Sequence, residues 1–193
     1  NAAGLGKVAD DHSDPDRYEK TNAHCDVLIA GGGGAGLMAA LAAGRSGARV
    51  ILADEQNEFG GWLLGESDTT IDGKTPADWV AGVVAELEAM PEVTLLPRTT
   101  VFGYMDHNYI TLTERVTDHL GERPTHLPRQ RMWKVRAGQT VLAQGAHERP
   151  LVFSGNDLPG VMLSGAVRSY ITRYGVVPGN RTVVFTNNDD AYR

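Results

Sequence analysis

The sequence has little cysteine, few aromatic residues and no excess of positive charge. Its 193 residues include one cysteine, Cys25, which excludes an intrachain disulfide, a CxxC redox pair and a cysteine-built metal site within these residues. Lys and Arg number 18 against 24 Asp and Glu, so the net charge is −6. A negative protein is a poor partner for nucleic acid or an anionic membrane, and we expect neither to be the main partner.

A long apolar segment is also missing. No run is long enough to span a bilayer, and the opening "NAAGLGKVADDHSDPDRYEK" has no apolar core of the signal-peptide type. Hydrophobic residues make up 41% and charged residues 22%, which is typical of a globular protein. We therefore expect a cytoplasmic location. Because the chain has no initiator Met and stops just after a predicted strand, we also expect an internal fragment of a longer chain.

Four consecutive glycines are the most informative feature of the sequence. In "VLIAGGGGAGLMAALAAGRSG", Gly31, Gly33 and Gly36 satisfy the pattern GxGxxG. The first glycine permits the tight turn, the second lets backbone approach a pyrophosphate, and the third lets a helix pack close to a strand. Gly34 and Ala35 lie in the turn, where their amides are candidate donors to the anion.

The residues around this turn support a nucleotide-binding interpretation over a purely structural glycine turn. An apolar strand is predicted over 25–31, a helix over 35–46 and a second strand over 48–54, which together form a βαβ unit. Asp54 ends the second strand 18 positions after Gly36, close to the spacing of about 20 for the acid that binds a ribose.

The acidic run Asp54, Glu55 and Gln56 restricts the choice of nucleotide. A carboxylate accepts hydrogen bonds from ribose hydroxyls and repels a 2′-phosphate, so NADP is disfavoured. NAD and FAD both carry this ribose, and the motif fits both. Glu55 and Gln56 also fit a solvated loop after a strand.

The remainder of the chain indicates an α/β protein with a Rossmann-like FAD/NAD(P)-binding fold, a central parallel sheet and an antiparallel β-meander crossover. Helices are predicted over 75–90 and 164–175, a meander over 101–136, and strands over 93–97, 139–145 and 181–186. The predicted organisation is a linker or extended arm at 1–24, a dinucleotide-binding domain at 25–180, and the start of a second α/β subdomain at 181–193.

Two further residues are candidates for nucleotide contact. Trp62 follows the glycine pair of the next loop and could cover a nucleotide or simply pack. The element order resembles that of two-dinucleotide-binding flavoproteins, in which the backbone near Val101 would pass the adenine. The segment "TNNDDAY" has no second glycine turn, which argues against a second dinucleotide. We identify no catalytic constellation and no metal-ligand spacing in these residues.

Several longer stretches are more specific than the glycine motif. Together "RTTVFGYMDHNYITLTERVTDHL", "GAHERPLVF", "ITRYGVVPG" and "VVFTNNDDAY" resemble the alpha subunits of heterotetrameric sarcosine oxidases over nearly the whole chain. Alpha subunits of opine oxidases and hydrogen cyanide synthase share the layout more loosely. The resemblance implies oxidative demethylation of sarcosine to glycine, with tetrahydrofolate as one-carbon acceptor and release of hydrogen peroxide.

The same resemblance implies a division of cofactors within the complex. NAD would lie in the alpha subunit, FAD in beta and FMN between alpha and beta, with gamma and delta completing the complex. The residues that match NAD-binding positions are Gly31, Gly33, Gly34, Ala35, Gly36, Asp54, Glu55, Gln56, Trp62 and Val101. This chain departs from the family at Gly34, where proline is usual, and at Trp62, where a small or hydroxylated residue is common.

Three alternatives remain open from the sequence. The same turn could hold FAD in a self-contained oxidoreductase, or the chain could belong to an opine oxidase-type alpha subunit. It could also be a non-catalytic domain that holds a nucleotide as a structural element and docks the other subunits.

Overall fold

A computed structural model describes residues 13–192 and places six strands in one mixed sheet. Across the sheet the order is β3-β2-β1-β6-β5-β4. The first four of these are mutually parallel; β5 pairs antiparallel with β6, and β4 pairs antiparallel with β5. The predicted α/β class with a parallel sheet and an antiparallel meander is confirmed. The strands are β1 (Tyr18–Ala30), β2 (Val50–Ala53), β3 (Val93–Leu96), β4 (Thr99–Met105), β5 (Tyr109–Arg115) and β6 (Gln130–Leu142).

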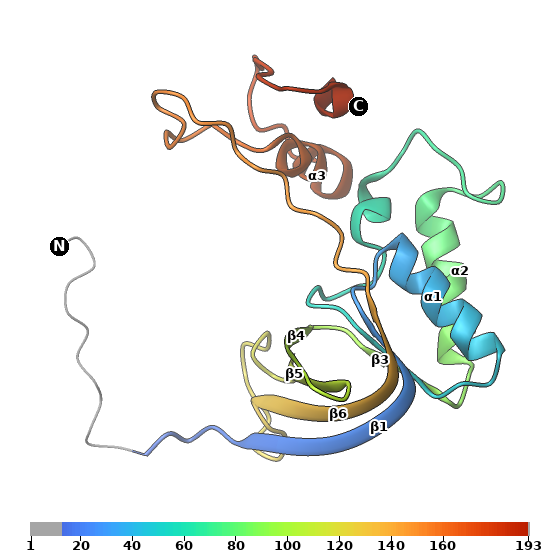
Figure 1. Cartoon of the computed structure of the whole chain (residues 1–193). Coiled ribbons are helices and arrows are strands. Elements are labelled where there is room, and N and C mark those ends of the chain that lie inside the picture. The colour runs from blue at the N-terminus through green and yellow to red at the C-terminus, as the bar shows by residue number, and fades with distance from the viewer. Residues whose placement is uncertain (1–12, 193) are drawn as a thin grey trace.

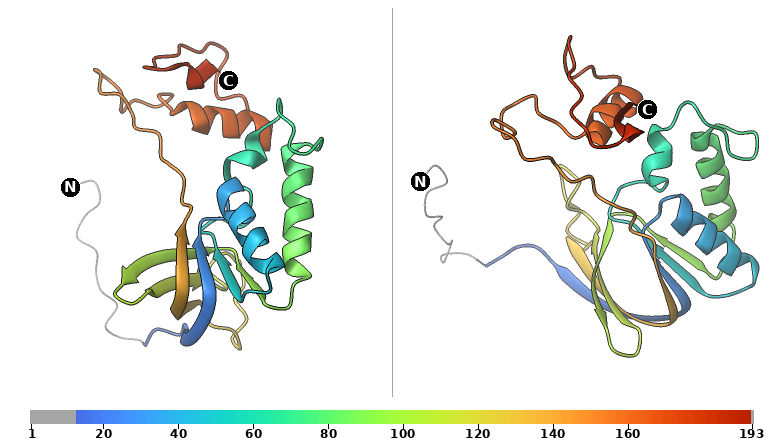
Figure 2. Two further views of the ribbon diagram at one scale, coloured as in Figure 1. Left: turned by 45° about the vertical axis from the view of Figure 1, so that its right-hand side comes forward. Right: turned by 45° about the horizontal axis from the view of Figure 1, so that its top comes forward.

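Helices α1 (Gly34–Arg45) and α2 (Pro76–Glu88) lie side by side against the parallel strands (Figures 1 and 2). The start of α2 follows from its sequence, because Thr75 accepts a hydrogen bond from the Asp78 amide at 3.1 Å and Pro76 occupies the first turn. Gly47, at φ +82°, follows α1 in the left-handed conformation expected of a glycine there.

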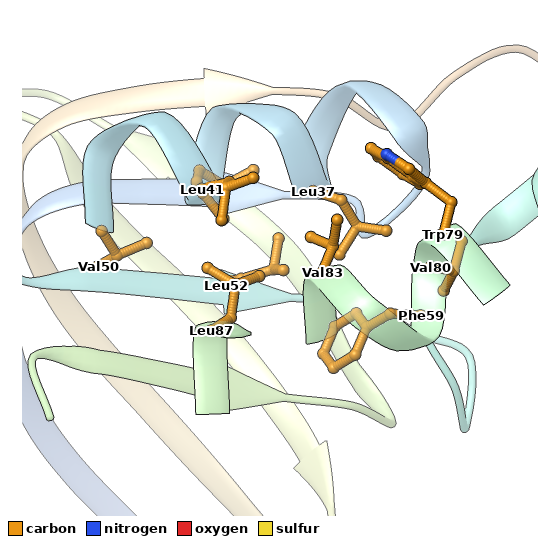
Figure 3. Close-up of a cluster of buried hydrophobic side chains, with 11 residues drawn as sticks. Leu37, Leu41, Val50, Leu52, Phe59, Trp79, Val80, Val83 and Leu87 are labelled. Carbon is orange, nitrogen blue, oxygen red and sulfur yellow. The ribbon is translucent and has the colours of Figure 1, made fainter. Parts of the chain in front are cut away.

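Both faces of β2 and of residues 28–30 of β1 are buried, which explains why these segments are continuous apolar runs. On one face, Ile29 and Leu52 pack against α1 and α2, as Figure 3 shows for Leu52. On the other face, Leu28 and Ile51 pack against β5 and β6 residues such as Leu112. The long strands β1 and β6 curve strongly, so the antiparallel part of the sheet folds back over the parallel part (Figure 1).

The first strand begins earlier than the sequence predicted. β1 starts at Tyr18 and not at Cys25, so residues 18–24, predicted as part of a linker or arm, lie in the sheet. The strands predicted within 101–136 and over 139–145 are joined, because β6 runs unbroken from Gln130 to Leu142. The two long strands pair from Tyr18↔Gln130 to Ala30↔Leu142. Residues 1–12 of the predicted arm lie outside the described residues.

The segment after β6 has little regular structure. It contains helix α3 (Ser164–Tyr174), which was predicted, and Gly175 ends this helix at φ +65°. The strand predicted over 181–186 is wrong, because these residues pair with no strand and Val183 is 93% exposed. Two short 3₁₀ helices complete the fold, η1 (Gly61–Gly65) and η2 (Asp189–Tyr192).

Candidate functional site

The glycine turn is the point where β1, β6 and α1 meet. Gly31 has φ +106°, and a Cβ on it would lie 2.3 Å from the carbonyl oxygen of Ala143. A Cβ on Gly36 would lie 1.8 Å from the carbonyl oxygen of Gly31. Real side chains do not tolerate such distances, so both positions require glycine for close backbone packing. The sequence predicted the tight turn at Gly31, which agrees with its positive φ, and close packing at Gly36.

Gly33 differs from its neighbours because the space beside it is open. A Cβ placed on Gly33 meets no atom within 4 Å, although Gly33 immediately precedes α1. No side chain caps this helix and its first turn contains no acidic residue. The amides of Gly34 and Ala35 lie in that first turn, at the positive end of the helix. The arrangement suits a bound pyrophosphate.

Asp54 joins the glycine turn to its own loop, with one carboxylate oxygen on each. Oδ2 accepts a hydrogen bond from the Gly32 amide at 2.5 Å, and Oδ1 accepts one from the Gln56 amide at 2.8 Å. The Asp54 carbonyl also accepts a hydrogen bond from the Thr99 amide at 2.7 Å. Asp54 therefore joins the end of β2 to the glycine turn and to the start of β4.

Glu55 and Gln56 line a cavity of about 360 Å³ beside the end of β2. Within residues 13–192 the Glu55 carboxylate has neither a hydrogen-bond partner nor an ion-pair partner, whereas its carbonyl accepts a hydrogen bond from Arg115 Nη2. The other lining residues were not singled out from the sequence, and most of them lie far along the chain from Glu55, at the end of β5 and in the segments before β4 and after β5: Asn57, Arg98, Arg115, Asp118 and His119.

Asp118 is fixed at the rim of this cavity. Its Oδ2 accepts a hydrogen bond from Gln130 Nε2 at 2.7 Å, and Arg129 Nε binds its other oxygen. These hydrogen bonds, that of Gln130 first, lower the pKa of the Asp118 carboxyl. The carboxylate therefore remains charged at neutral pH, and its charge is balanced by Arg129.

The last two predicted residues belong to other elements, Trp62 to η1 and Val101 to β4. Trp62 is 51% exposed and its ring lies against the backbone of Gly165 in α3. Leu63, its neighbour in η1, is the residue that approaches Gly34. Val101 lies half-buried in β4, opposite Leu112 and next to a β-bulge.

Sequence reasoning missed Phe59, which is buried and lies where a Cβ on Gly32 would be. The only feature of the sequence that could have indicated Phe59 is its position in a loop directly before the glycine pair Gly60 and Gly61. Residues 13–192 contain no cluster of three or more His, Cys, Asp or Glu side chains able to hold a metal ion. The described helices are all too short or too polar to cross a membrane.

The geometry can now be compared with known proteins. Residues 26–144, more than half of the chain, match the family described as FAD dependent oxidoreductase. This chain belongs to the FAD-dependent oxidoreductases. The matched residues run from Asp26, within β1, to Gln144, the residue after Ala143, so they contain the glycine turn and the residues at the end of β2.

Relatives within this family are close. The sarcosine oxidase alpha subunit of Rhizobium meliloti (strain 1021) is 55% identical over 99% of this chain, and the match covers 19% of that relative. One subunit of the opine oxidase of Agrobacterium tumefaciens (strain Ach5) is 32% identical over 82% of this chain and 31% of its own length. The expected resemblance to sarcosine oxidase alpha subunits is confirmed, and the chain spans about a fifth of their length.

The fold is shared with a solved structure. L-proline dehydrogenase from P. horikoshii superposes with a TM-score of 0.67 at 24% identity, covering 85% of this chain and 31% of that enzyme. At this identity the match supports the Rossmann-like fold.

Proposed function

We propose that this chain is the NAD-holding part of the alpha subunit of a sarcosine oxidase. In this proposal the complete complex contains beta, gamma and delta subunits, FAD and FMN, lies in the cytoplasm, and oxidatively demethylates sarcosine to glycine with tetrahydrofolate as acceptor. The observation that carries it is the open glycine turn at an uncapped helix start, in a chain 55% identical to a sarcosine oxidase alpha subunit. The opine oxidase alternative is weaker because that relative is 32% identical.

The residues present fit an adenine dinucleotide. The amides at the start of α1 would bind its pyrophosphate, and open space beside Gly33 would admit it. Glu55, whose carboxylate is unpaired among the described residues, would accept hydrogen bonds from the adenosine ribose. Bound NAD supplies a hydride acceptor; the role of these residues is to hold and orient it. We infer no catalytic residue in this chain, which would act only within the assembly.

FAD is the second candidate for the same turn. The family description names FAD, and FAD carries the same pyrophosphate and adenosine ribose. Under this alternative the chain would be part of a flavin-dependent oxidoreductase whose flavin lies in this subunit. The two candidates differ in what co-purifies: the NAD proposal predicts a colourless alpha subunit that binds added NAD, and the alternative predicts a yellow one.

The test compares two neighbouring acids in the full-length alpha subunit. Replacing Glu55 with Gln should weaken NAD binding about tenfold, because the charged acceptor becomes neutral and one of its two acceptor oxygens becomes an NH2 donor, and should leave thermal stability unchanged. Replacing Asp54 with Asn should lower both affinity and stability, because its oxygens hold the Gly32 and Gln56 amides. Calorimetric titration and thermal unfolding measure the two quantities. Flavin in the purified subunit, with no NAD affinity, would refute the proposal.

Turnover of the complete complex separates a structural role for the nucleotide from a functional one. If the Glu55→Gln complex loses NAD yet oxidises sarcosine at the normal rate, the nucleotide serves docking alone, as in the non-catalytic alternative. If turnover falls together with NAD content, the nucleotide contributes to the reaction.

A further inference from the structure

Helix α3 is attached to the nucleotide-binding part of the molecule through one face. The Trp62 ring lies against Gly165, where a Cβ would come within 2.1 Å of it. Two ion pairs follow along the same contact, Arg168 with Glu66 and Arg173 with Glu58. The inner face of α3 therefore carries a glycine and two arginines, and the side chains that these three residues contact, those of Trp62, Glu66 and Glu58, belong to the loop around η1.

The start of α3 is fixed by a carboxylate from the preceding segment. Glu148 accepts hydrogen bonds from Ser164 Oγ at 2.6 Å and from the Gly165 amide at 2.9 Å. A negative charge at this end of a helix is stabilising. The helix thus has a set position above the sheet, which Figure 2 shows from two sides.

The outer face of α3 is an apolar stripe that is largely exposed within residues 13–192: three of its four side chains are exposed and Val167 is half-buried. Val167, Tyr170, Ile171 and Tyr174 follow the spacing i, i+3, i+4, i+7, which puts them on one side of the helix. Ile171 is 48% exposed, Tyr170 and Tyr174 are also exposed, and these two rings contact each other edge to face at 6.2 Å. In a globular protein such a stripe normally faces a core.

Further exposed apolar residues extend the surface beyond the helix. Together with the exposed members of the stripe, the two valines that follow the helix form what we name the α3 surface: Tyr170, Ile171, Tyr174, Val176 and Val177. A cluster of exposed apolar residues of this kind marks an interaction site.

We propose that the α3 surface packs against a further folded part of the same polypeptide. The close relative matches this chain over 99% of its length but only over 19% of its own, so most residues of such a subunit lie outside the matched region. A tethered partner acts at an effective concentration of about millimolar, which favours it over a separate chain for covering an apolar surface. This inference concerns an interface and is independent of which nucleotide binds.

Site-specific crosslinking in the full-length alpha subunit tests the occupant directly. A photo-reactive amino acid is placed at position 171, and the crosslinked peptide is identified by mass spectrometry. The matched control is position 38, because Met38 lies on α1 and is 49% exposed, close to the value for Ile171. We expect position 171 to crosslink to peptides of the same chain outside residues 1–193, with at least tenfold higher yield than position 38.

Three outcomes would overturn the proposal: no crosslink above the control, a crosslink to a second copy of the chain, or a crosslink to a different protein of the complex. A charge substitution gives an independent measurement. Ile171→Glu should lower the thermal transition of the full-length subunit by several degrees, and Met38→Glu should not; an equal effect of the two would contradict the proposal. NAD affinity is measured in the same samples, so failure of the nucleotide proposal would be recognised separately.

Discussion

Residues 18–142 bury an apolar core on both faces of a sheet, whereas residues 143–192 leave most of their large apolar side chains exposed. In the first region, alternate residues of β1 face opposite layers. Ile29 is buried against the helices, and Leu28 is buried against the folded-back strands. In the second region, Gly165 is the single buried residue among those described.

The difference lies in tertiary partners and not in local sequence signals. Helix α3 has a carboxylate at its start, a glycine at its end and an apolar stripe at helical spacing, as a packed helix would. What it lacks, within the described part of the chain, is a second layer to cover the stripe. Local signals thus suffice to form an element, and burial of its apolar side requires another surface.

The largest expected difference between the two regions comes from truncating one apolar residue in each. Leu37 in α1 is 0% exposed and contacts the cluster drawn in Figure 3, so Leu37→Ala should cost about 3 kcal/mol of unfolding free energy. In the isolated chain, Ile171→Ala should cost less than about 0.5 kcal/mol. Urea unfolding measures both values, and similar costs would show that α3 already packs in a core.

The glycine turn allows a second contrast, within the packed region itself. Gly36→Ala should destabilise the chain by about 2–3 kcal/mol, because the new methyl group would overlap the Gly31 carbonyl. Gly33→Ala meets no atom within 4 Å and should leave stability unchanged while weakening NAD binding about tenfold. Unfolding and titration of both variants check this, and a Gly33→Ala variant with normal affinity would place the pyrophosphate elsewhere.

Trp62 connects the two regions, and its removal tests what holds α3 in place. Trp62→Ala should loosen α3 by roughly 1 kcal/mol, because packing against Gly165 is lost, and should speed amide exchange in α3 about fivefold. Exchange in α2 serves as the internal control. Unchanged exchange in α3 together with weaker NAD binding would instead assign Trp62 to the nucleotide.

The smallest expected effect concerns acid stability of the packed region. Hydrogen bonds from the Arg49 side chain and amide lower the pKa of the Asp26 carboxyl to about 2. The folded pKa lies below the ordinary value of 3.8, so the ionised form stabilises the fold above about pH 4, and this stabilisation is lost as the pH falls toward 2. Asp26→Asn should flatten this part of the melting-temperature profile, and an unaltered slope would contradict the assignment.

The structural features that the sequence predicted best are those that depend on short-range patterns. The turn at Gly31–Gly36 and the positions of helices α2 and α3 all follow from neighbouring residues, and the helices observed at Pro76–Glu88 and Ser164–Tyr174 lie within the predicted ranges 75–90 and 164–175. The strand at 18–24 was missed because its residues alternate between exposed and half-buried and pair with residues more than a hundred positions away.

The residues of the candidate site also differ in whether short-range patterns could have predicted them. The glycines were assignable from their spacing, whereas the different surroundings of Asp54 and Glu55 were not. Both are acids at the end of one strand, and only the folded chain directs Asp54 to the Gly32 amide and leaves Glu55 beside a cavity. Arg98 precedes β4 and Arg115 ends β5, so both reach that cavity from parts of the chain distant from Glu55, and no local pattern could have indicated them.

The pairing of β1 with β6 has a consequence for how the chain folds during synthesis. β1 leaves the ribosome well before β6, its partner along the whole length from Tyr18 to Ala30, which is made only when residues 130–142 emerge. Until then the backbone N–H and C=O groups along one edge of β1 have no hydrogen-bond partner. The apolar face that later packs against β6 is also exposed to other chains. Closing so long a loop is slow because its entropy must be lost before any strand contact forms. The same pairing that completes the nucleotide-binding sheet thus makes the nascent chain dependent on protection while it waits for β6.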